Sequence, residues 1–364
     1  MKETIFRANH EKLGAKMVEF AGFYMPIQYE GLSVEHQHVR KKVGVFDVSH
    51  MGEFIVKGTN ALPLLQYITS NDVSKLTPGK IQYSCFPNGK GGIVDDLLLY
   101  QTAEQEYLLV VNAANIEKDW AWIAKHNEKF GATIENISEE ISLLAVQGPL
   151  ALKAMQKLTD TNIEAMEYYT SQYLTFAGVP DILLSTTGYT GAGGCEIYFK
   201  NKDGEKIWNA VFEAGKEFDI KPIGLAARDT LRLEMGFCLY GHEIDDTISP
   251  IEAGLGWITK FVDHKDFIDK DYMLQLKANG LKRKLIGFEM IDRGIPRIDY
   301  EVCDKEGNKI GIVRSGTFGP SINKSIGTAW IDINFAALDT EIYIKIREKL
   351  LKAIVVKMPF YKGE

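Results

Sequence analysis

Two adjacent aspartates interrupt a hydrophobic stretch of the sequence. Residues 91–100 read GGIVDDLLLY, and the pair is Asp95 and Asp96. Side chains alternate along a strand, so these two carboxylates are expected on opposite faces. A carboxylate among aliphatic side chains is costly unless it is hydrogen-bonded or lines a cavity. Two interpretations stay open: one aspartate accepts hydrogen bonds from the Gly91-Gly92 turn, or one of them lines a ligand pocket.

A glycine-rich segment leads to another carboxylate. Residues 188–196 read GYTGAGGCE and include Tyr189 and Glu196. The segment is neither a Walker loop nor a GxGxxG motif that opens a helix, because a strand follows it. The pattern favours a tight hairpin loop over phosphate binding. Such a loop would bring Tyr189 and Glu196 to one end of a sheet, where a carboxylate can accept two parallel N–H bonds.

Two arginines follow at helical spacing in residues 226–234, which read AARDTLRLE. Arg228 and Arg232 are i, i+4 neighbours, and Asp229 and Glu234 can partly offset their charge. Taken alone, this spacing favours the solvent-exposed face of a helix.

Alternating strands and helices are expected to position these residues. The hydrophobic periodicity predicts strands at 54–56, 83–86, 93–100, 107–111, 141–146, 173–176, 182–186 and 196–199. It predicts helices from a cap at Ser33 towards Gly44, around 62–68, from a cap at Asn115 to Gly131, after Pro149, along 207–218 and along 222–236. The first strands, with an Asn88-Gly89 turn, are typical of a small antiparallel sheet.

The pattern changes after Asn279-Gly280, where a domain boundary is expected. Six short strand-like segments alternate with glycine and aspartate turns, at 285–290, 300–303, 310–314, 325–330, 342–346 and 354–357. This arrangement predicts an all-β barrel or Greek-key module.

Composition narrows the function classes. The chain has 364 residues, of which 45% are hydrophobic, and a net charge of −7, which argues against a nucleic-acid partner. Its length predicts two or three domains.

The four cysteines are far apart and form no CxxC pair, so buried free thiols are expected. No HExxH motif or Cys/His cluster suggests a metal site. No apolar run of about 18 residues suggests a membrane helix. Residues 1–14 resemble no signal peptide, and a cytoplasmic protein is therefore expected.

The chain resembles the T-protein (aminomethyltransferase) family of the glycine cleavage system over essentially its full length. The matching runs, in order, are residues 35–40, FDVSHMGE at 46–53, GGIVDDL at 91–97, VNA at 111–113, QGP at 147–149, GYTG at 188–191 with Glu196, ARDTLRLE at 227–234, RGIPR at 293–297, SGTFGPS at 315–321 and MPF at 358–360. The order and spacing of these runs make the resemblance specific. One departure is the loop after Thr190, where the family often has acidic residues and this chain has Ala192 and Gly193.

The resemblance implies an α+β fold with three domains in a cloverleaf-like arrangement. Residues 1–279 would form the folate-binding aminomethyltransferase region, built from two interleaved α+β subdomains, roughly 1–52 with 137–230 and 53–136 with 231–279. Residues 280–364 would form the C-terminal β-barrel.

The resemblance also implies the reaction and its partners. The chain would transfer an aminomethyl carbon from the lipoylated H-protein to tetrahydrofolate as co-substrate, giving methylenetetrahydrofolate, ammonia and the dihydrolipoyl carrier. No metal, flavin or nicotinamide is implied, nor any membrane partner. Two alternatives stay open: a folate-dependent demethylase of the same fold, and a non-catalytic folate-binding protein.

The resemblance assigns roles to particular positions. Asp96 matches the catalytic aspartate, which would stabilise positive charge on the transferred carbon or orient the folate. Folate-contacting positions are matched by Tyr83, Asn112, Tyr189, Glu196, Arg228 and Tyr169, with Tyr168 as an alternative to Tyr169. Glu196 would pair with pterin N–H donors, and Arg228 would bond the pterin oxygen edge or hold Glu196 in place.

Overall fold

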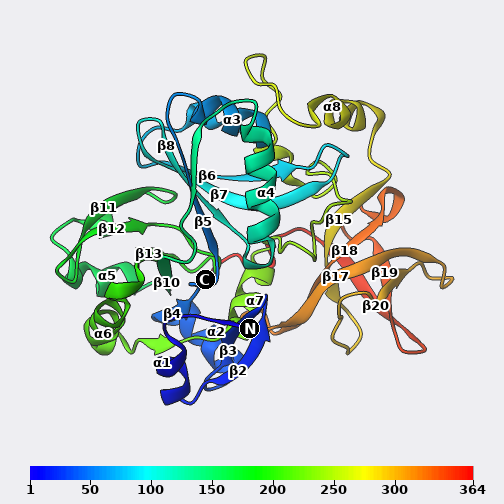
Figure 1. Ribbon diagram of the computed structural model, residues 1–364. Coiled ribbons are helices and arrows are strands. Elements are labelled where there is room, and N and C mark those ends of the chain that lie inside the picture. The colour runs from blue at the N-terminus through cyan, green and yellow to red at the C-terminus, as the bar shows by residue number, and fades with distance from the viewer. Residues whose placement is uncertain (364) are drawn as a thin grey trace. The chain divides into compact units, whose positions relative to one another are not determined.

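The computed structural model describes residues 1–363 and divides into two compact units. The first unit comprises Met1–Ile68, Asp72–Ser84 and Asp96–Arg228, and the second comprises Thr69–Asn71, Cys85–Asp95 and Asp229–Glu364. Figure 1 shows the elements of both units.

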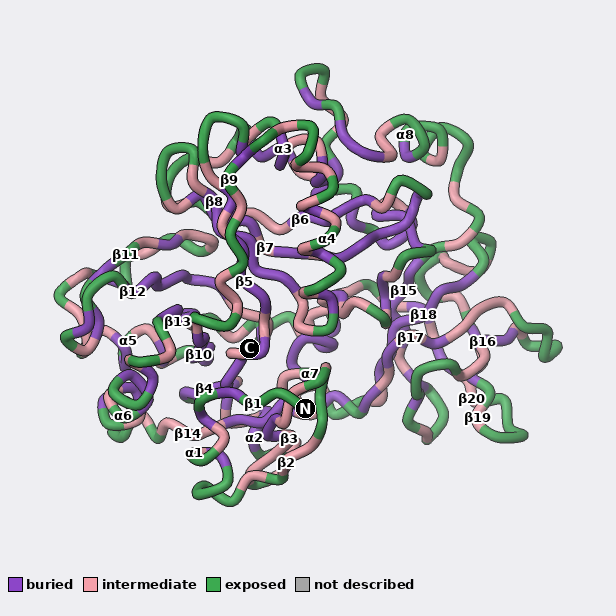
Figure 2. The backbone as a smooth tube through the Cα atoms, in the orientation of Figure 1, coloured by how far each residue is buried: buried purple, intermediate pink, exposed green. Residues whose placement is uncertain are grey.

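A six-stranded sheet forms the centre of the first unit. Its strand order is β11 (Ser171–Phe176), β12 (Val179–Ser185), β13 (Gly194–Lys200), β10 (Ile141–Gln147), β4 (Gly44–Asp47) and β14 (Lys221–Pro222). Aliphatic and aromatic residues of β10 and β13 pack against α5 (Ala151–Met155) and α6 (Gly204–Gly215) to form one hydrophobic core. Figure 2 shows that these central strands are buried. The predicted strands and the helix after Pro149 are confirmed here.

A second, five-stranded sheet belongs mostly to the first unit. Its order is β6 (Ile81–Pro87), β7 (Ile93–Ala103), β8 (Glu106–Val111), β5 (Gly52–Lys57) and β9 (Thr133–Asn136). The helices α3 (Ala61–Ile68) and α4 (Ile116–Asn127) cover one face of it (Figure 1), and the rings of Phe54 and Trp120 lie 5.4 Å apart there. Because side chains alternate, Glu53 points to the opposite face from Phe54.

The N-terminal segment of the first unit is fixed by a buried polar network. The segment comprises β1 (Lys2–Glu3), α1 (Arg7–Lys12), β2 (Lys16–Phe20) and β3 (Phe23–Gln28). Asp47 Oδ2 accepts a hydrogen bond from Thr4 Oγ1 at 2.6 Å and lies 2.9 Å from His10 Nε2. His10 Nδ1 in turn lies 2.8 Å from the hydroxyl of Tyr29. Since Asp47 and His10 are both buried, these bonds hold the segment against β4.

The predicted start of the next helix is wrong. The helix α2 spans Leu32–Lys41 with Gly31 as its N-cap, so Ser33 lies inside the first turn. Glu35 satisfies the helix start instead, because its Oε1 accepts hydrogen bonds from the backbone amides of Tyr29 and Gly31 at 2.7 and 2.9 Å. The predicted end also shifts, since Gly44 lies in β4.

The helix α7 is shorter than predicted and spans Leu225–Glu234. Pro222 is part of β14, which pairs in parallel with β4. Proline has no backbone N–H, so it cannot donate a hydrogen bond within a helix. A strand at the edge of a sheet tolerates it, and Pro222 lies in such a strand.

A closed six-stranded barrel forms the centre of the second unit. Its order is β15 (Arg283–Met290), β18 (Lys324–Asp332), β17 (Lys309–Gly319), β16 (Glu301–Cys303), β19 (Glu341–Ile346) and β20 (Lys349–Val356). Inward-facing residues such as Phe288, Val313 and Ile342 are fully buried and form its core. Before the barrel, α8 spans Lys270–Asn279 and ends with Gly280 in the C-cap position.

The α+β class and the C-terminal barrel are therefore confirmed, whereas the expected division into three domains stays a prediction. All four cysteines are buried with free thiols. Within residues 1–363, no helix is long and apolar enough to cross a membrane.

Candidate functional site

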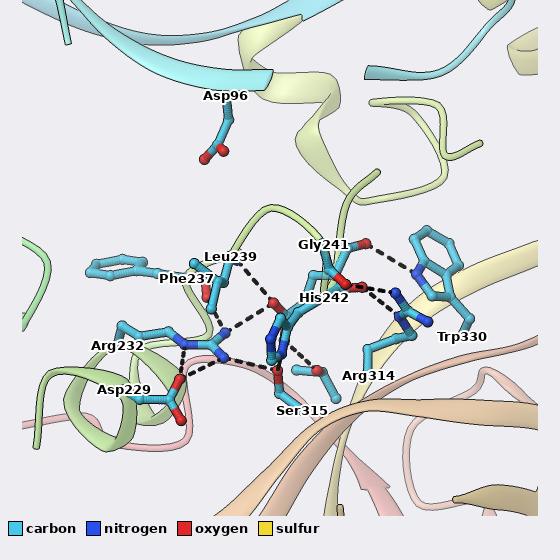
Figure 3. Close-up of polar contacts among 12 residues, drawn as sticks. Asp96, Asp229, Arg232, Phe237, Leu239, Gly241, His242, Arg314, Ser315 and Trp330 are labelled. Carbon is cyan, nitrogen blue, oxygen red and sulfur yellow. Dashed lines mark hydrogen bonds and ion pairs between the residues drawn. The ribbon is translucent and has the colours of Figure 1, made fainter. Parts of the chain in front are cut away.

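Asp96 is held by two other residues predicted for the site. Its half-buried side chain projects from β7 (Figure 3). Tyr83 on β6 donates its hydroxyl to Asp96 Oδ2 at 2.7 Å, and Asn112 Nδ2 donates to Asp96 Oδ1 at 2.9 Å. These contacts follow from strand order, because β6 and β8 flank β7 and Asn112 directly follows β8. Each oxygen of the carboxylate therefore has a fixed donor.

The glycine turn before β7 uses acceptors other than the two aspartates. Asn88 Oδ1 accepts from the Gly92 amide at 3.0 Å, and Asp269 Oδ2 accepts from the Gly91 amide at 3.0 Å. The interpretation that Asp95 or Asp96 serves mainly to satisfy this turn is therefore wrong.

The segment 188–194 is a hairpin loop, as predicted, and it connects β12 to β13. Gln147 at the end of β10 shapes this loop: its Nε2 donates to the Thr187 carbonyl at 3.1 Å, and its Oε1 accepts from Thr190 Oγ1 at 2.8 Å. A Cβ on Gly188 would lie 1.9 Å from Gln147 Oε1 and would displace the Gln147 amide. The buried amide thus fixes the loop that presents Tyr189 and leads into Glu196.

Glu196 is a buried carboxylate with both a polar and a cationic neighbour. Thr187 Oγ1 donates a short hydrogen bond to Glu196 Oε2. Burial raises the pKa of Glu196, while the Thr187 bond and the Arg228 charge act in the opposite direction. Arg228 also lies over the ring of Tyr189, with its guanidinium carbon 4.7 Å from the ring centre. Arg228 therefore links the tyrosine and the carboxylate of the loop.

Tyr169 is a partly buried tyrosine next to the exposed Tyr168. Burial raises its pKa, and the charges of Glu196 and Asp96 both add to that rise. Its backbone has φ of +63°, a left-handed conformation that is uncommon for a bulky residue and is often found at functional sites. The neighbouring Tyr168 is 65% exposed. Tyr169 is therefore the more buried of the two tyrosines, and the choice between them as a folate contact stays a prediction.

Comparisons with known proteins agree with this geometry. Residues 6–263 match the family described as "GCVT N-terminal domain", and residues 283–362 match the "Glycine cleavage T-protein C-terminal barrel domain". The chain belongs to the glycine cleavage T-protein family. The family resemblance seen in the sequence is thus confirmed, and so is its enzyme class, that of an aminomethyltransferase.

Individual T-proteins are similar over their whole length. An aminomethyltransferase of Flavobacterium psychrophilum is 59% identical over 362 residues, and one of Bacteroides fragilis is 60% identical over 362 residues, with 100% of each chain covered in both cases. The crystal structure of the glycine cleavage system aminomethyltransferase T from Bartonella henselae is 32% identical with a TM-score of 0.93, covering 100% of this chain and 98% of that one.

All seven predicted site residues lie in the first unit of this T-protein family member. They are Tyr83, Asp96, Asn112, Tyr169, Tyr189, Glu196 and Arg228. The hydrogen bonds and ring contacts described above connect Asp96 with Tyr83 and Asn112, and Tyr189 with Arg228. Their roles in binding and catalysis stay predictions.

The FDVSHMGE run contains three buried ionisable residues with no role predicted from the sequence: Asp47, which bonds Thr4 and His10, and also His50 and Glu53. Glu53 is 1% exposed, and no hydrogen-bond partner reaches either of its carboxyl oxygens within residues 1–363. Burial raises its pKa well above the ordinary value, so the carboxyl is neutral in the fold. Pairing of Glu53 with Val110, and of Val110 with Leu98, places Glu53 on the same sheet face as Asp96. His50 is also buried, and burial followed by the Arg228 charge lowers its pKa to about 4. The signal in the sequence was three ionisable residues within eight positions, directly before an apolar strand.

Arg232 was expected on a solvent-exposed face of α7, and this expectation is wrong. The residue belongs to the second unit, and its side chain is 1% exposed. It forms ion pairs at 2.9 Å with buried Glu243 and with Asp229, and it donates to Ser315 Oγ at 2.9 Å (Figure 3). Thr328 on β18 donates to Glu243 Oε1 at 2.6 Å. Arg232 thus fixes the segment after α7 to the barrel strands.

Proposed function

We propose that this chain transfers an aminomethyl carbon from a lipoylated carrier protein to tetrahydrofolate, with release of ammonia. Family membership supports the reaction class. The observation that carries the proposal is the Asp96 carboxylate, held at both oxygens by Tyr83 and Asn112 in the unit that also holds Glu196 and Arg228. The cytoplasmic location remains a prediction from the sequence.

Glu196 fits the donor edge of a pterin ring. Its Oε2 accepts a hydrogen bond from Thr187 Oγ1. A carboxylate suits two parallel N–H donors, which a pterin offers at its ring nitrogen and amino group. Tyr189 and Tyr169 supply aromatic surface beside it, and Arg228 supplies a cation for an oxygen of the same ring. The described residues therefore fit tetrahydrofolate.

Asp96 has two roles in this proposal: it stabilises positive charge on the transferred carbon, and it is already held in a fixed orientation. In the transfer the bond from carbon to the lipoyl sulfur breaks, ammonia leaves, and the carbon becomes bonded to two folate nitrogens. Positive charge develops on that carbon, and a fixed carboxylate nearby stabilises it. Because Tyr83 and Asn112 already hold both oxygens, the carboxylate needs little rearrangement during the reaction.

Two linked assays test the function. Tetrahydrofolate binding is measured first, and then the release of ammonia and the formation of methylenetetrahydrofolate from an aminomethyl-loaded lipoyl carrier. We expect ammonia release to require both folate and carrier. Binding without carrier-dependent release would contradict the transfer reaction and favour a demethylase or a non-catalytic folate-binding protein.

The binding site is tested by Glu196→Gln, which keeps the shape and removes the charge. We expect much weaker tetrahydrofolate binding. The matched control is Glu205→Gln, at an exposed glutamate of α6, which should bind normally. Equal affinity of the Glu196→Gln and control proteins would remove Glu196 from the pterin site.

A further inference from the structure

Four buried hydroxyl groups lie behind Glu196. Thr187 Oγ1, which donates to Glu196, lies 2.6 Å from Ser185 Oγ and 3.3 Å from the Tyr100 hydroxyl. The Tyr100 hydroxyl lies 2.7 Å from that of Tyr198. All four residues are at most 4% exposed.

The carboxylate imposes a direction on these hydrogen bonds. An ionised carboxylate only accepts, and a hydroxyl has one proton to donate. Thr187 must therefore point its proton at Glu196, and its oxygen then accepts from Ser185 and Tyr100. A buried chain of this kind strengthens each bond within it and fixes the carboxylate at its end.

The chain also joins the two sheets of the first unit. Tyr198 shares a face of β13 with Glu196, because the two residues are two positions apart. Tyr100 shares a face of β7 with Asp96, because four positions separate them. The contact between the Tyr100 and Tyr198 hydroxyls therefore ties the strand that carries Asp96 to the strand that carries Glu196.

We propose that the Tyr198–Tyr100–Thr187 hydroxyl chain is a positioning device that fixes the ionised Glu196 carboxylate for the pterin and sets its distance from Asp96. This proposal rests on the proposed folate-binding function. Thr187 is the key member, since it alone touches the carboxylate, and Tyr100 supports it from the other sheet.

Other groups facing Glu196 bear on its ionisation. Arg228 from α7 contributes a positive charge. The remaining titratable neighbours are neutral groups whose pKa values are raised by burial and further by the Glu196 charge, and they are Tyr100, Tyr168, Tyr169, Cys195 and Tyr198. None of them can replace the proton that Thr187 donates, so removing this hydroxyl leaves Arg228 as the sole group that favours the charged form.

The test measures tetrahydrofolate affinity from about pH 5 to about pH 8 in four variants. Thr187→Val removes the hydroxyl and keeps the branched shape, whereas Thr187→Ser restores the hydroxyl. Tyr100→Phe removes the second hydroxyl of the chain. The matched control, Thr133→Val, removes an exposed hydroxyl at the start of β9. Thermal unfolding of each variant is recorded alongside.

We expect Thr187→Val to bind about 10- to 100-fold more weakly at neutral pH, as is typical for loss of a hydrogen bond to a charged group. Loss of binding with falling pH should begin at a higher pH than in the unchanged protein. Thr187→Ser should recover most of the affinity, Tyr100→Phe should lose less than Thr187→Val, and Thr133→Val should bind normally.

The outcomes separate this inference from the proposed function. If Glu196→Gln abolishes binding but Thr187→Val binds with normal affinity and an unchanged pH profile, the positioning role is refuted and the folate site stands. A loss of affinity by the same factor at every pH also refutes it, because a packing defect alone would act that way. If Thr187→Val does not fold, the comparison of Thr187→Ser with Tyr100→Phe decides by the same criteria. Normal binding by Glu196→Gln would instead refute the folate site itself.

Discussion

Replacing Asp96 by asparagine tests the central assignment most directly, because it removes a charge and leaves the shape. Tyr83 and Asn112 donate to opposite oxygens of the carboxylate at 2.7 and 2.9 Å. An asparagine offers a single acceptor oxygen, which can keep the bond from Asn112 Nδ2, and its own amide then donates to the Tyr83 hydroxyl. The variant therefore loses the charge and keeps both neighbours.

The magnitude follows from Coulomb's law. A unit charge about 4 Å from the carboxylate is stabilised by roughly 4 kcal/mol at an effective dielectric constant of about 20. The transferred carbon carries part of a unit charge at the transition state, so about 2–4 kcal/mol should be lost. Because each 1.36 kcal/mol or so is a factor of ten, Asp96→Asn should slow transfer about 30- to 1000-fold.

The assay is tetrahydrofolate-dependent ammonia release from a loaded carrier at saturating folate, so that the rate of transfer rather than binding is measured. Asp160→Asn, at an exposed aspartate of the same unit, is the matched control and should transfer at the normal rate. A fall of less than about threefold in Asp96→Asn, with normal folding, would refute the electrostatic role. A loss confined to folate affinity would assign Asp96 to binding instead.

Three further predictions concern ionisation, stability and orientation. Burial raises the pKa of Glu53, so the folded protein keeps a proton that the unfolded chain releases above about pH 4. Stability is therefore lost as the pH rises from that value, and Glu53→Gln should become progressively more stable than the unchanged protein between about pH 4 and pH 8 in denaturant unfolding. Arg232→Met leaves the buried Glu243 without its cation and should cost about 3–5 kcal/mol of unfolding free energy. Tyr83→Phe removes one donor to Asp96 and should slow transfer about tenfold with a melting temperature close to normal.

Each of these three predictions has a result that would contradict it. A stability difference for Glu53→Gln that does not change with pH would show that the carboxyl is ionised in the fold. For Arg232, the double variant Arg232→Met/Glu243→Gln should be less destabilised than the sum of the single variants, and simple additivity would contradict the buried pair. For Tyr83, a large drop in melting temperature would point to packing rather than orientation of Asp96.

Local sequence patterns predicted most of the elements correctly. The aliphatic run around Asp95 and Asp96 forms β7, the glycine-rich segment before Glu196 forms a hairpin loop, and the segments after Gly280 close into a barrel. Periodicity and turn residues act over a few positions, so they are readable without knowledge of the fold. The order and spacing of the motifs predicted the family, which the comparisons confirm.

Helix ends and burial were predicted less well. Ser33 has the right chemistry for a cap, but Glu35 satisfies the helix start through the amides of Tyr29 and Gly31. Arg232 has the spacing of an exposed residue, but Glu243 and Ser315 surround it in the interior. For Arg232, these partners come from outside the local pattern.

The sequence by itself determined the elements, the family and the chemical types of the site residues. Tertiary structure alone decided which of these side chains meet: Asp96 with Tyr83 and Asn112, and Thr187 with Tyr100, 87 positions away. The physical reason is that hydrogen bonds and burial depend on distances in space, which strand pairing and sheet packing set between segments far apart in the chain. The same packing leaves Glu53 buried and neutral, a state that no pattern of neighbouring residues specifies.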